Sequence, residues 1–272
     1  MSRLARNWNQ GAGIASWAAA LFILWEVLAW IVHRVLQLTQ PDSKLPYLHK
    51  VIGSMQENLP VLIKQGITTF GNSMTGFLIG SAFGFLLAVV MSLSKTVEQT
   101  LSPYMVASQM VPIIGLAPII YGILHDPGVS RIVMSGYVTF FPVTINALRG
   151  LRSVQPEQLE LMRSLAASTW QVYIKLKLPS ALPGVFAGLK LSAPLAITAS
   201  IIVELMGAPD GIGVLMVSSL YYGAAQVYMF WCTVLASIAI GFASYLLLTL
   251  AERWFTPWQP DFRASVNGRE RA

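Results

Sequence analysis

The sequence has 272 residues, of which 55% are hydrophobic and 11% charged, and its formal net charge is +6. A soluble domain carries roughly 25% charged residues, so this composition excludes an ordinary water-soluble protein and predicts a chain that uses lipid as its solvent. The basic residues flank apolar runs, which favours topology signals over a nucleic-acid surface. The single cysteine, Cys232, excludes an internal disulfide and a cysteine cluster for a metal.

The first apolar run covers residues 14–32. It is long for a signal-peptide core and no small-x-small cleavage site follows it, so we expect an uncleaved membrane span. Glu26 lies inside this run, and an acidic group within a span usually faces protein or a cavity. Two interpretations stay open for Glu26: a pathway residue, or a carboxylate paired with a neighbouring helix. Residues 39–65 predict an external loop with a short amphipathic helix.

A second span is expected over residues 67–93, and it carries glycines at four-residue spacing. These are Gly76, Gly80 and Gly84. Small residues at that spacing let another helix backbone approach closely. We therefore interpret the three glycines as a helix-packing face.

A third span is expected over residues 103–124, and it contains Pro112 and Pro118. Each proline removes a backbone donor and tends to kink the helix, which is tolerated where the backbone is buried in protein or lines a cavity. The segment is therefore either a pathway element or a kinked packing helix. A tight turn at residues 125–128 leads to a fourth span over residues 132–148.

A fifth span is expected over residues 184–205 and a sixth over residues 228–250. Glu204 lies at the end of the fifth and, like Glu26, is either a pathway or a structural residue. Six spans place both termini on one side. The basic residues concentrate in the segments on that side, so we expect cytoplasmic termini. The segments on the opposite, external side hold fewer basic residues: Arg34, Lys44, Lys50, Lys64 and Arg131.

The polar segment at residues 149–183 predicts two short cytoplasmic helices. Pro156 can occupy the first position of a helix. Apolar residues then recur at three- and four-residue spacing: Leu159, Met162 and Ala166. This spacing gives one apolar stripe. A second helix is expected over residues 170–177, capped by Ser168 or Thr169. Such a hairpin either lies on the membrane or binds a partner.

The same loop resembles the "EAA" coupling loop of ABC-importer permeases. Glu160 stands at the position of the motif's acid, Ala166 at the position of its glycine, and Leu178-Pro179 match the closing pair at the right spacing. Leu161 and Met162 replace the motif's alanines, and Ala166 replaces its glycine. The departures keep small or apolar residue types.

The resemblance extends over about residues 20–255 and is greatest to the nitrate/sulfonate/taurine/bicarbonate branch of these permeases. The segments that carry it are Leu24-Trp-Glu26, Leu45-Pro46, Val111-Pro112 with Ala117-Pro118, Phe140-Phe-Pro142, and Val203-Glu204 with Gly211-Ile-Gly213. The resemblance implies an all-α, polytopic inner-membrane protein with six transmembrane helices and the type I ABC-importer permease fold. The expected organisation is an N-terminal helix and external loop (1–66), a permease core (67–252) and a cytoplasmic tail (253–272).

The resemblance also implies partners and a mechanism. Two permease copies, with a homodimer expected, form a pathway for a small solute that an external binding protein delivers. Two cytoplasmic ABC ATPase subunits grip the coupling loops, and their closure on ATP switches the pathway from inward- to outward-facing. The residues implied in ATPase coupling are Glu160, Leu161, Met162, Leu165, Ala166, Leu178 and Pro179. The solute would be nitrate-, sulfonate-, taurine- or bicarbonate-like, or related to the thiamine pyrimidine.

The sequence also bears on two other classes of function. A membrane enzyme is disfavoured because the sequence has no HExxH, no GxSxG and no P-loop, so we expect no catalytic residue, metal or cofactor in this chain and a separate ATPase. An ion-coupled secondary transporter or channel is the alternative, with Glu26 and Glu204 as proton relays. No inverted repeat is visible in the two halves to support it.

Overall fold

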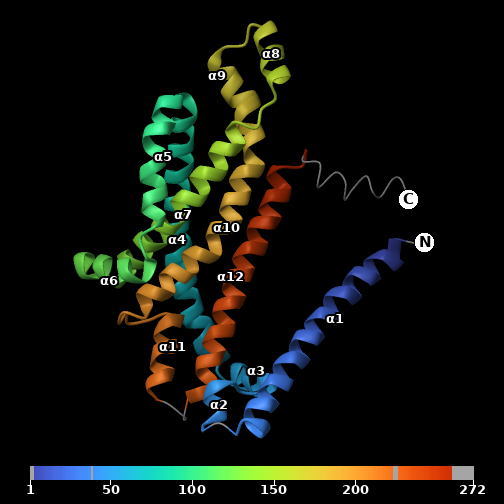
Figure 1. Cartoon of the computed structure of the whole chain (residues 1–272), viewed down its shortest axis with the longest axis vertical. Coiled ribbons are helices and arrows are strands. Elements are labelled where there is room, and N and C mark those ends of the chain that lie inside the picture. Colours follow the sequence, from blue (N-terminus) through green and yellow to red (C-terminus); the bar gives the residue numbers. More distant parts are fainter. Residues whose placement is uncertain (1–2, 38, 223–225, 259–272) are drawn as a thin grey trace. The chain divides into compact units, whose positions relative to one another are not determined.

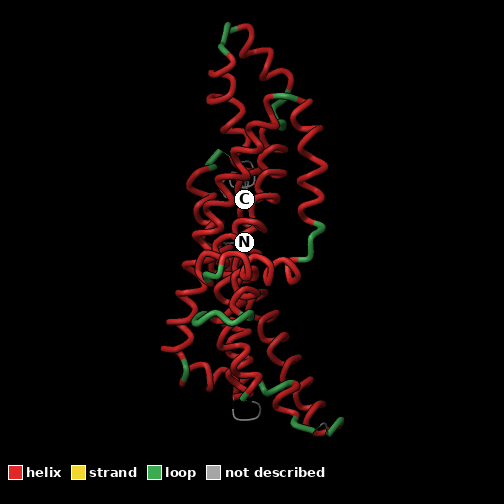
Figure 2. The backbone as a smooth tube through the Cα atoms, turned by 90° about the vertical axis from the view of Figure 1, so that its left-hand side faces the viewer, coloured by secondary structure: helices red, strands yellow, loops and turns green. Residues whose placement is uncertain are grey.

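The computed structural model describes residues 3–37, 39–222 and 226–258, and every regular element in these ranges is a helix (Figures 1 and 2). The helices form two units. One unit runs to Lys64 and includes Leu215–Ala236. The other is Gln65–Val214 together with the chain from Ser237 onward.

The first unit is organised around a long N-terminal helix. In this helix, the Trp25 indole donates a hydrogen bond from Nε1 to the carbonyl oxygen of Pro46 (2.9 Å). The same ring packs edge-on against Trp231, with the two ring centroids 5.4 Å apart. Cys232 lies buried nearby, with its Sγ 3.5 Å from the carbonyl oxygen of Val51. The unit contains α1 (Arg3–Trp30), a π-helical turn η1 (Ile31–Val35), α2 (Pro41–Lys44), α3 (Leu48–Glu57) and parts of α4, α11 (Ile212–Tyr221) and α12 (Val227–Phe255).

The second unit contains the remaining helices: most of α4 (Leu59–Leu93), α5 (Lys95–Gln109), α6 (Ile113–Leu124), α7 (Pro127–Leu151), α8 (Pro156–Ser164), α9 (Thr169–Val172), the π-helical turn η2 (Tyr173–Lys177) and α10 (Leu178–Glu204). Helices α7 and α10 pack side by side at its centre (Figure 1). One buried apolar cluster joins α4, α5, α7 and α10, and its members are Ala88, Met91, Met105, Ala147, Leu148, Leu151 and Ala181.

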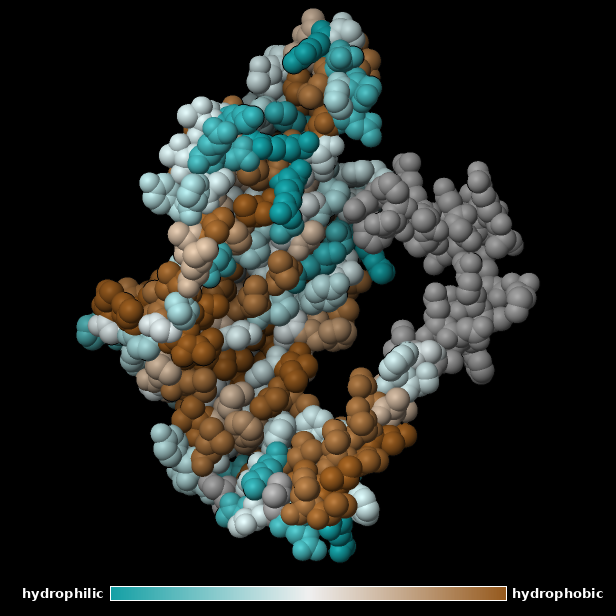
Figure 3. Space-filling model, viewed as in Figure 1, coloured by the Kyte–Doolittle hydropathy of each residue, from teal (hydrophilic) through white to brown (hydrophobic). Residues whose placement is uncertain are grey.

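Within the described ranges, five helical runs are long and apolar enough to cross a membrane. They are Ser16–Val35, Leu59–Leu93, Pro127–Leu151, Thr169–Glu204 and Val227–Phe255. A sixth span arises if the bent pair α5 and α6 is counted as one. The all-helical, multi-pass architecture expected from the sequence is thereby confirmed. Figure 3 shows apolar side chains over α6 and hydrophilic ones over the end that carries α8.

Helix α4 and the helical run that contains α10 begin well before the spans that the sequence predicted. Helix α4 begins at Leu59 rather than at residue 67, because Pro60 fits the first turn of a helix, where its missing N–H is not needed. The fifth span is part of a helical run from Thr169 to Glu204. The chain passes through η2 into α10, and Pro179 stands in the first turn of α10. Pro60 and Pro179, which the sequence placed in polar segments outside the spans, therefore lie inside helices.

Candidate functional site

The polar loop forms a helical hairpin at the end of α7 and α10, as Figure 1 shows. Its first helix is α8, with Pro156 at its first position. Ser168 caps α9: its Oγ accepts from the backbone N–H of Gln171 (3.3 Å), and the Gln171 side chain accepts from the Ser168 N–H (2.8 Å). This reciprocal pair is a capping box, and it identifies Ser168 rather than Thr169 as the cap.

Ala166 forms the turn between the two helices and has a backbone φ of +51°. The Ala166 N–H donates to the carbonyl of Arg163 (2.9 Å) and the Ala167 N–H to that of Met162 (3.0 Å). These two bonds make a Schellman helix end, whose left-handed position is usually glycine. A side chain there costs roughly 1 kcal/mol relative to glycine. The geometry therefore gives a physical reason for a glycine at this position of the motif.

The hairpin presents apolar side chains on its surface. Leu161 is 61% exposed and Leu165 is 68% exposed, while Met162 is half-buried. Glu160 is exposed beside them. These candidate residues therefore lie on the surface of this chain. Leu178 is different, because it packs against the buried cluster at the base of α10.

The base of the hairpin is fixed by contacts that sequence reasoning missed. The Arg152 guanidinium forms a two-fold ion pair with the Glu98 carboxylate, in which Nη1 and Oε1 are 2.6 Å apart. The hydroxyls of Ser92 and Tyr173 are 3.1 Å apart, and Lys177 Nζ lies 4.3 Å from the Tyr173 ring centroid. Such bidentate arginine pairs set the orientation of the partners as well as adding energy. α5 and α4 therefore support both ends of the hairpin.

The backbone of α7 lies directly against the glycines of α4. A Cβ built on Gly76 would lie 2.2 Å from the carbonyl oxygen of Ile132, and one on Gly80 would lie 2.4 Å from that of Gly136. At Gly84 the nearest atom is the carbonyl oxygen of Phe140, also at 2.4 Å. Real Cβ atoms do not approach other atoms so closely, so only glycine fits at these three positions.

The third predicted span is broken at Pro112. Helix α5 ends at Gln109, the chain turns, and α6 starts at Ile113 with its axis at 92° to that of α5. Pro112 precedes the first turn of α6, whereas Pro118 lies within α6 without interrupting it. The sequence located the break at one of the two prolines. Proline at a helix start is tolerated because its missing N–H has no helical partner to lose.

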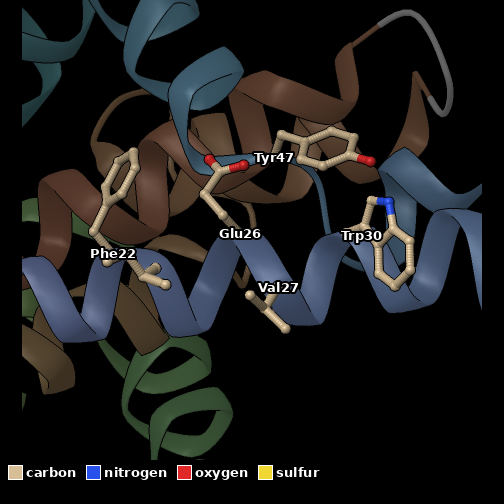
Figure 4. Close-up of a pocket in the computed structure, with 6 residues that line it drawn as sticks. Phe22, Glu26, Val27, Trp30 and Tyr47 are labelled. Carbon is tan, nitrogen blue, oxygen red and sulfur yellow. The ribbon is translucent and has the colours of Figure 1, made fainter.

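Glu26 lies in the first unit and contacts the first turn of α3. Its Oε1 accepts from the backbone N–H of His49 (3.0 Å), and the ring Nδ1 of His49 is 3.1 Å from the same oxygen. It also lines an apolar cavity of about 380 Å³ with Trp30, Tyr47 and neighbouring α1 residues. Figure 4 shows the Glu26 carboxylate directed toward the segment that carries Tyr47. The sequence left two interpretations of Glu26 open, a pathway residue or a carboxylate paired with a neighbouring helix, and His49 is such a partner.

Glu204 lies at the end of α10 in a buried charge cluster. Arg131 of α7 contributes Nη1, 3.3 Å from Glu204 Oε1, and Nη2, 2.9 Å from Asp210 Oδ1. The side chain of Glu204 is 0% exposed and that of Arg131 5%. Thr69 of α4 donates its hydroxyl to Glu204 (2.9 Å), and the Gly213 N–H donates to Oε2 (2.8 Å). The carboxylate is fully hydrogen-bonded, as a buried charge requires.

The sequence placed Arg131 just before the fourth span, among the basic residues of the outer segments, whereas the structure shows it buried within a helix. Arg131 lies one turn inside α7, where its Nε also donates to the Pro127 carbonyl (3.2 Å). Its partners Glu204 and Asp210 are more than 70 positions away. Local patterns carry no information on such a pairing. The one available signal was an unpaired acid at the end of an apolar run.

We predict that Glu204→Gln lowers the yield of folded protein much more than Glu26→Gln does. Breaking a buried ion pair from one side costs up to about 3–5 kcal/mol when the other charge is left uncompensated, and here Asp210, which stays paired with Arg131, offsets part of that cost. Glu26 is 22% exposed and its partner His49 61%, so its loss should cost about 1 kcal/mol. Fluorescence-detected size-exclusion chromatography of both variants measures the yields. Equal yields with altered solute preference would contradict a structural role for Glu204.

The chain matches a family model described as "Binding-protein-dependent transport system inner membrane component" over residues 76–257. The formylaminopyrimidine transport permease protein ThiX of Halalkalibacterium halodurans is 28% identical over 193 residues, which are 71% of this chain and 75% of ThiX. The taurine transport system permease protein TauC of Escherichia coli K12 is 28% identical over 248 residues, 91% of this chain and 90% of TauC.

The fold also matches solved structures. The inward-facing MetNI methionine ABC transporter aligns with a TM-score of 0.63 at 17% identity, covering 74% of this chain and 98% of the other. At that level of identity the match establishes a common fold.

Proposed function

Because this chain belongs to the family of binding-protein-dependent transport system inner membrane components, we propose that it carries a small solute inward through a pathway formed with a second permease copy. It is a multi-pass inner-membrane protein and its family is not an enzyme family. An external binding protein would deliver the solute. A separate pair of cytoplasmic ABC ATPases would supply the energy, since its relatives include ABC transporter permeases.

The observation that carries the coupling part of this proposal is the hairpin α8–α9. It stands at one end of α7 and α10 and exposes Leu161 and Leu165, which a protein normally buries. Met162 lies between them, and the acid Glu160 borders the patch. A short amphipathic helix with exposed apolar anchors matches the way helices dock into grooves of partner proteins. Leu178 and Pro179 would keep the base of the hairpin in place.

The direction of the chain across the membrane follows from its charges. The hairpin and its base hold Arg152, Arg163, Lys175 and Lys177, so the positive-inside rule favours a cytoplasmic hairpin and cytoplasmic termini. The glycines of α4 and the break at Pro112 then belong to the membrane-embedded core. Glu26 and Glu204 would serve structure rather than solute binding.

The solute class follows only from relatives. These include permeases for formylaminopyrimidine, taurine and nitrate, so we propose a small solute of one of these classes. The ion-coupled alternative loses support from the geometry of Glu204. A carboxylate held by Arg131, Thr69 and a backbone N–H has no free position for a relayed proton.

Purification of the tagged chain with its co-expressed ATPase in nanodiscs tests the proposal. We expect a complex of two permeases and two ATPases by native mass spectrometry, together with ATP hydrolysis that the chain alone does not show. A functional complex with one permease copy would overturn the dimer. Uptake by the chain without any ATPase would overturn the energy source and revive ion coupling.

A further inference from the structure

Helices α7 and α10 lead directly from the hairpin to the buried charge cluster. The helical run Thr169–Glu204 has 36 residues, so at 1.5 Å per residue it is about 54 Å long. It starts in the hairpin and ends at the glutamate that Arg131 binds. α7 runs alongside it, from Arg131 near one end to Arg152 just after the other. Figure 1 shows the hairpin and the loop after α10 at opposite ends of this pair.

The two helices touch through backbone along their length. A Cβ on Gly150 would lie 2.8 Å from the Ala181 carbonyl oxygen, one on Gly184 would lie 2.6 Å from that of Asn146, and one on Gly188 would lie 3.0 Å from that of Pro142. Further along, Ser135 donates its hydroxyl to the carbonyl of Ala196 (2.9 Å). Close-packed interfaces of this kind shift as units rather than deform continuously. We therefore treat α7 and α10 as one rigid rod pair.

At the end away from the hairpin, one guanidinium holds three partners. Arg131 binds the Pro127 carbonyl of its own helix, Glu204 at the end of α10, and Asp210 in the following loop, through both its carboxylate and its carbonyl (3.2 Å). That loop continues to Gly211, whose φ is +116° and whose Cβ would lie 2.2 Å from the Glu204 carboxyl carbon. The loop therefore has little freedom to move independently of the cluster.

The cluster also binds α4 and the start of α11. Gln65 accepts from the Gly211 N–H through Oε1 (2.6 Å), and the Thr69 hydroxyl oxygen accepts from the Ile212 N–H (2.9 Å) while donating to Glu204. Removing Arg131 from this arrangement would leave two acids near one another and would remove the side-chain bridge between the loop and α7. Among the residues that the structure describes, Arg131 is the cation that contacts both Glu204 and Asp210.

We infer that Arg131 is a positioning residue for transport: it locks the loop 205–211 to the α7–α10 rod pair, so that displacement of the hairpin by the ATPase moves this loop with it. The inference rests on the proposed function, because it requires an ATPase that moves the hairpin. A guanidinium is needed for this role, since it has several donors in a fixed planar arrangement, whereas lysine offers a single ammonium.

Pulsed electron-spin distance measurements test this in the permease–ATPase complex in nanodiscs. In a Cys232→Ala background, one sample carries a spin label at Glu157→Cys in α8 and a second at Pro209→Cys in the loop, both exposed sites. Each label reports the distance between the two permease copies, without nucleotide and after trapping with ATP and vanadate. With Arg131 present, we expect trapping to shift both distances.

In Arg131→Lys we expect the shift at position 157 to persist and the shift at position 209 to fall by at least about half, since lysine keeps the charge but not the bridge. Arg149→Lys, at an exposed position of the same helix, is the matched control and should keep both shifts. If Arg131→Lys does not assemble, Asp210→Asn tests the same bridge. The Asp210 side chain is 46% exposed, and removing its charge leaves the Arg131–Glu204 pair intact.

The outcomes separate this inference from the proposed function. A complex that shows no two-copy distance, or no shift at position 157 with Arg131 present, refutes the proposed function. A normal shift at position 157 with none at position 209 in that same protein refutes the rigid connection. Full shifts at both positions in Arg131→Lys and Asp210→Asn refute the role of Arg131.

Discussion

Replacing Ala166 with arginine should leave membrane insertion intact and abolish recovery of the ATPase with this chain. In the proposed interface, Ala166 stands at the tight turn between α8 and α9, beside the exposed anchors Leu161 and Leu165. A long charged side chain buried there without a partner would cost several kcal/mol. A few anchors carry most of the binding energy of such an interface, so that loss is enough to release the partner. Co-purification of the ATPase and solute uptake measure the effect.

Ala166→Gly is the matched control. It adds no atoms and removes the cost of a left-handed alanine, so ATPase recovery should be unchanged or higher and the hairpin should gain about 1 kcal/mol. Glu160→Ala should show a milder form of the arginine defect. If the hairpin only rested on the membrane, an added arginine would be harmless beside anionic lipid. Equal ATPase recovery and full uptake in Ala166→Arg would refute the coupling assignment.

Gly80→Ala should destabilise the chain by about 3 kcal/mol, a large effect for a single methyl group. The new Cβ would meet the carbonyl oxygen of Gly136 at 2.4 Å and its Cα at 2.7 Å. Both atoms belong to the backbone, so no side-chain rotation relieves the overlap and α4 and α7 have to separate. The expected result is a markedly lower midpoint in a thermal unfolding assay in detergent.

Gly71→Ala provides the comparison within the same helix. Nothing lies within 4 Å of a Cβ at that position, so the change should be neutral or stabilising by up to about 1 kcal/mol through helix propensity. Similar midpoints for Gly80→Ala and Gly71→Ala would show that the close approach of α4 and α7 is not required for stability. A joint fall of both midpoints would indicate a general intolerance of α4 to change.

The parts of this protein that could be predicted from sequence are those that local interactions decide. The helical hairpin followed from Pro156, the apolar spacing and a serine able to cap the second helix. The family resemblance found in that loop is confirmed by the match over residues 76–257. The break near Pro112 followed from the geometry of proline.

The remainder depends on which helices meet, and the sequence alone does not specify that. Arg131 looked like a loop charge until α7 brought it against Glu204. The helix start at Leu59 and the continuation of the helix from Lys177 into α10 were missed because prolines near a helix start resemble prolines in a loop. The left-handed backbone at Ala166 was also out of reach, since alanine does not ordinarily adopt it.

The length of the Thr169–Glu204 run has a consequence for how the protein senses its membrane. The hydrocarbon core of a bilayer is about 30 Å thick, so a rod of about 54 Å exceeds it by roughly 20 Å even when tilted. Apolar residues continue to Val203, so most of that excess lies at the end with the hairpin. The hairpin would stand clear of the headgroups. Lipids of different chain length would change how deeply the helical run is immersed, without changing which side chains the hairpin exposes to its partner.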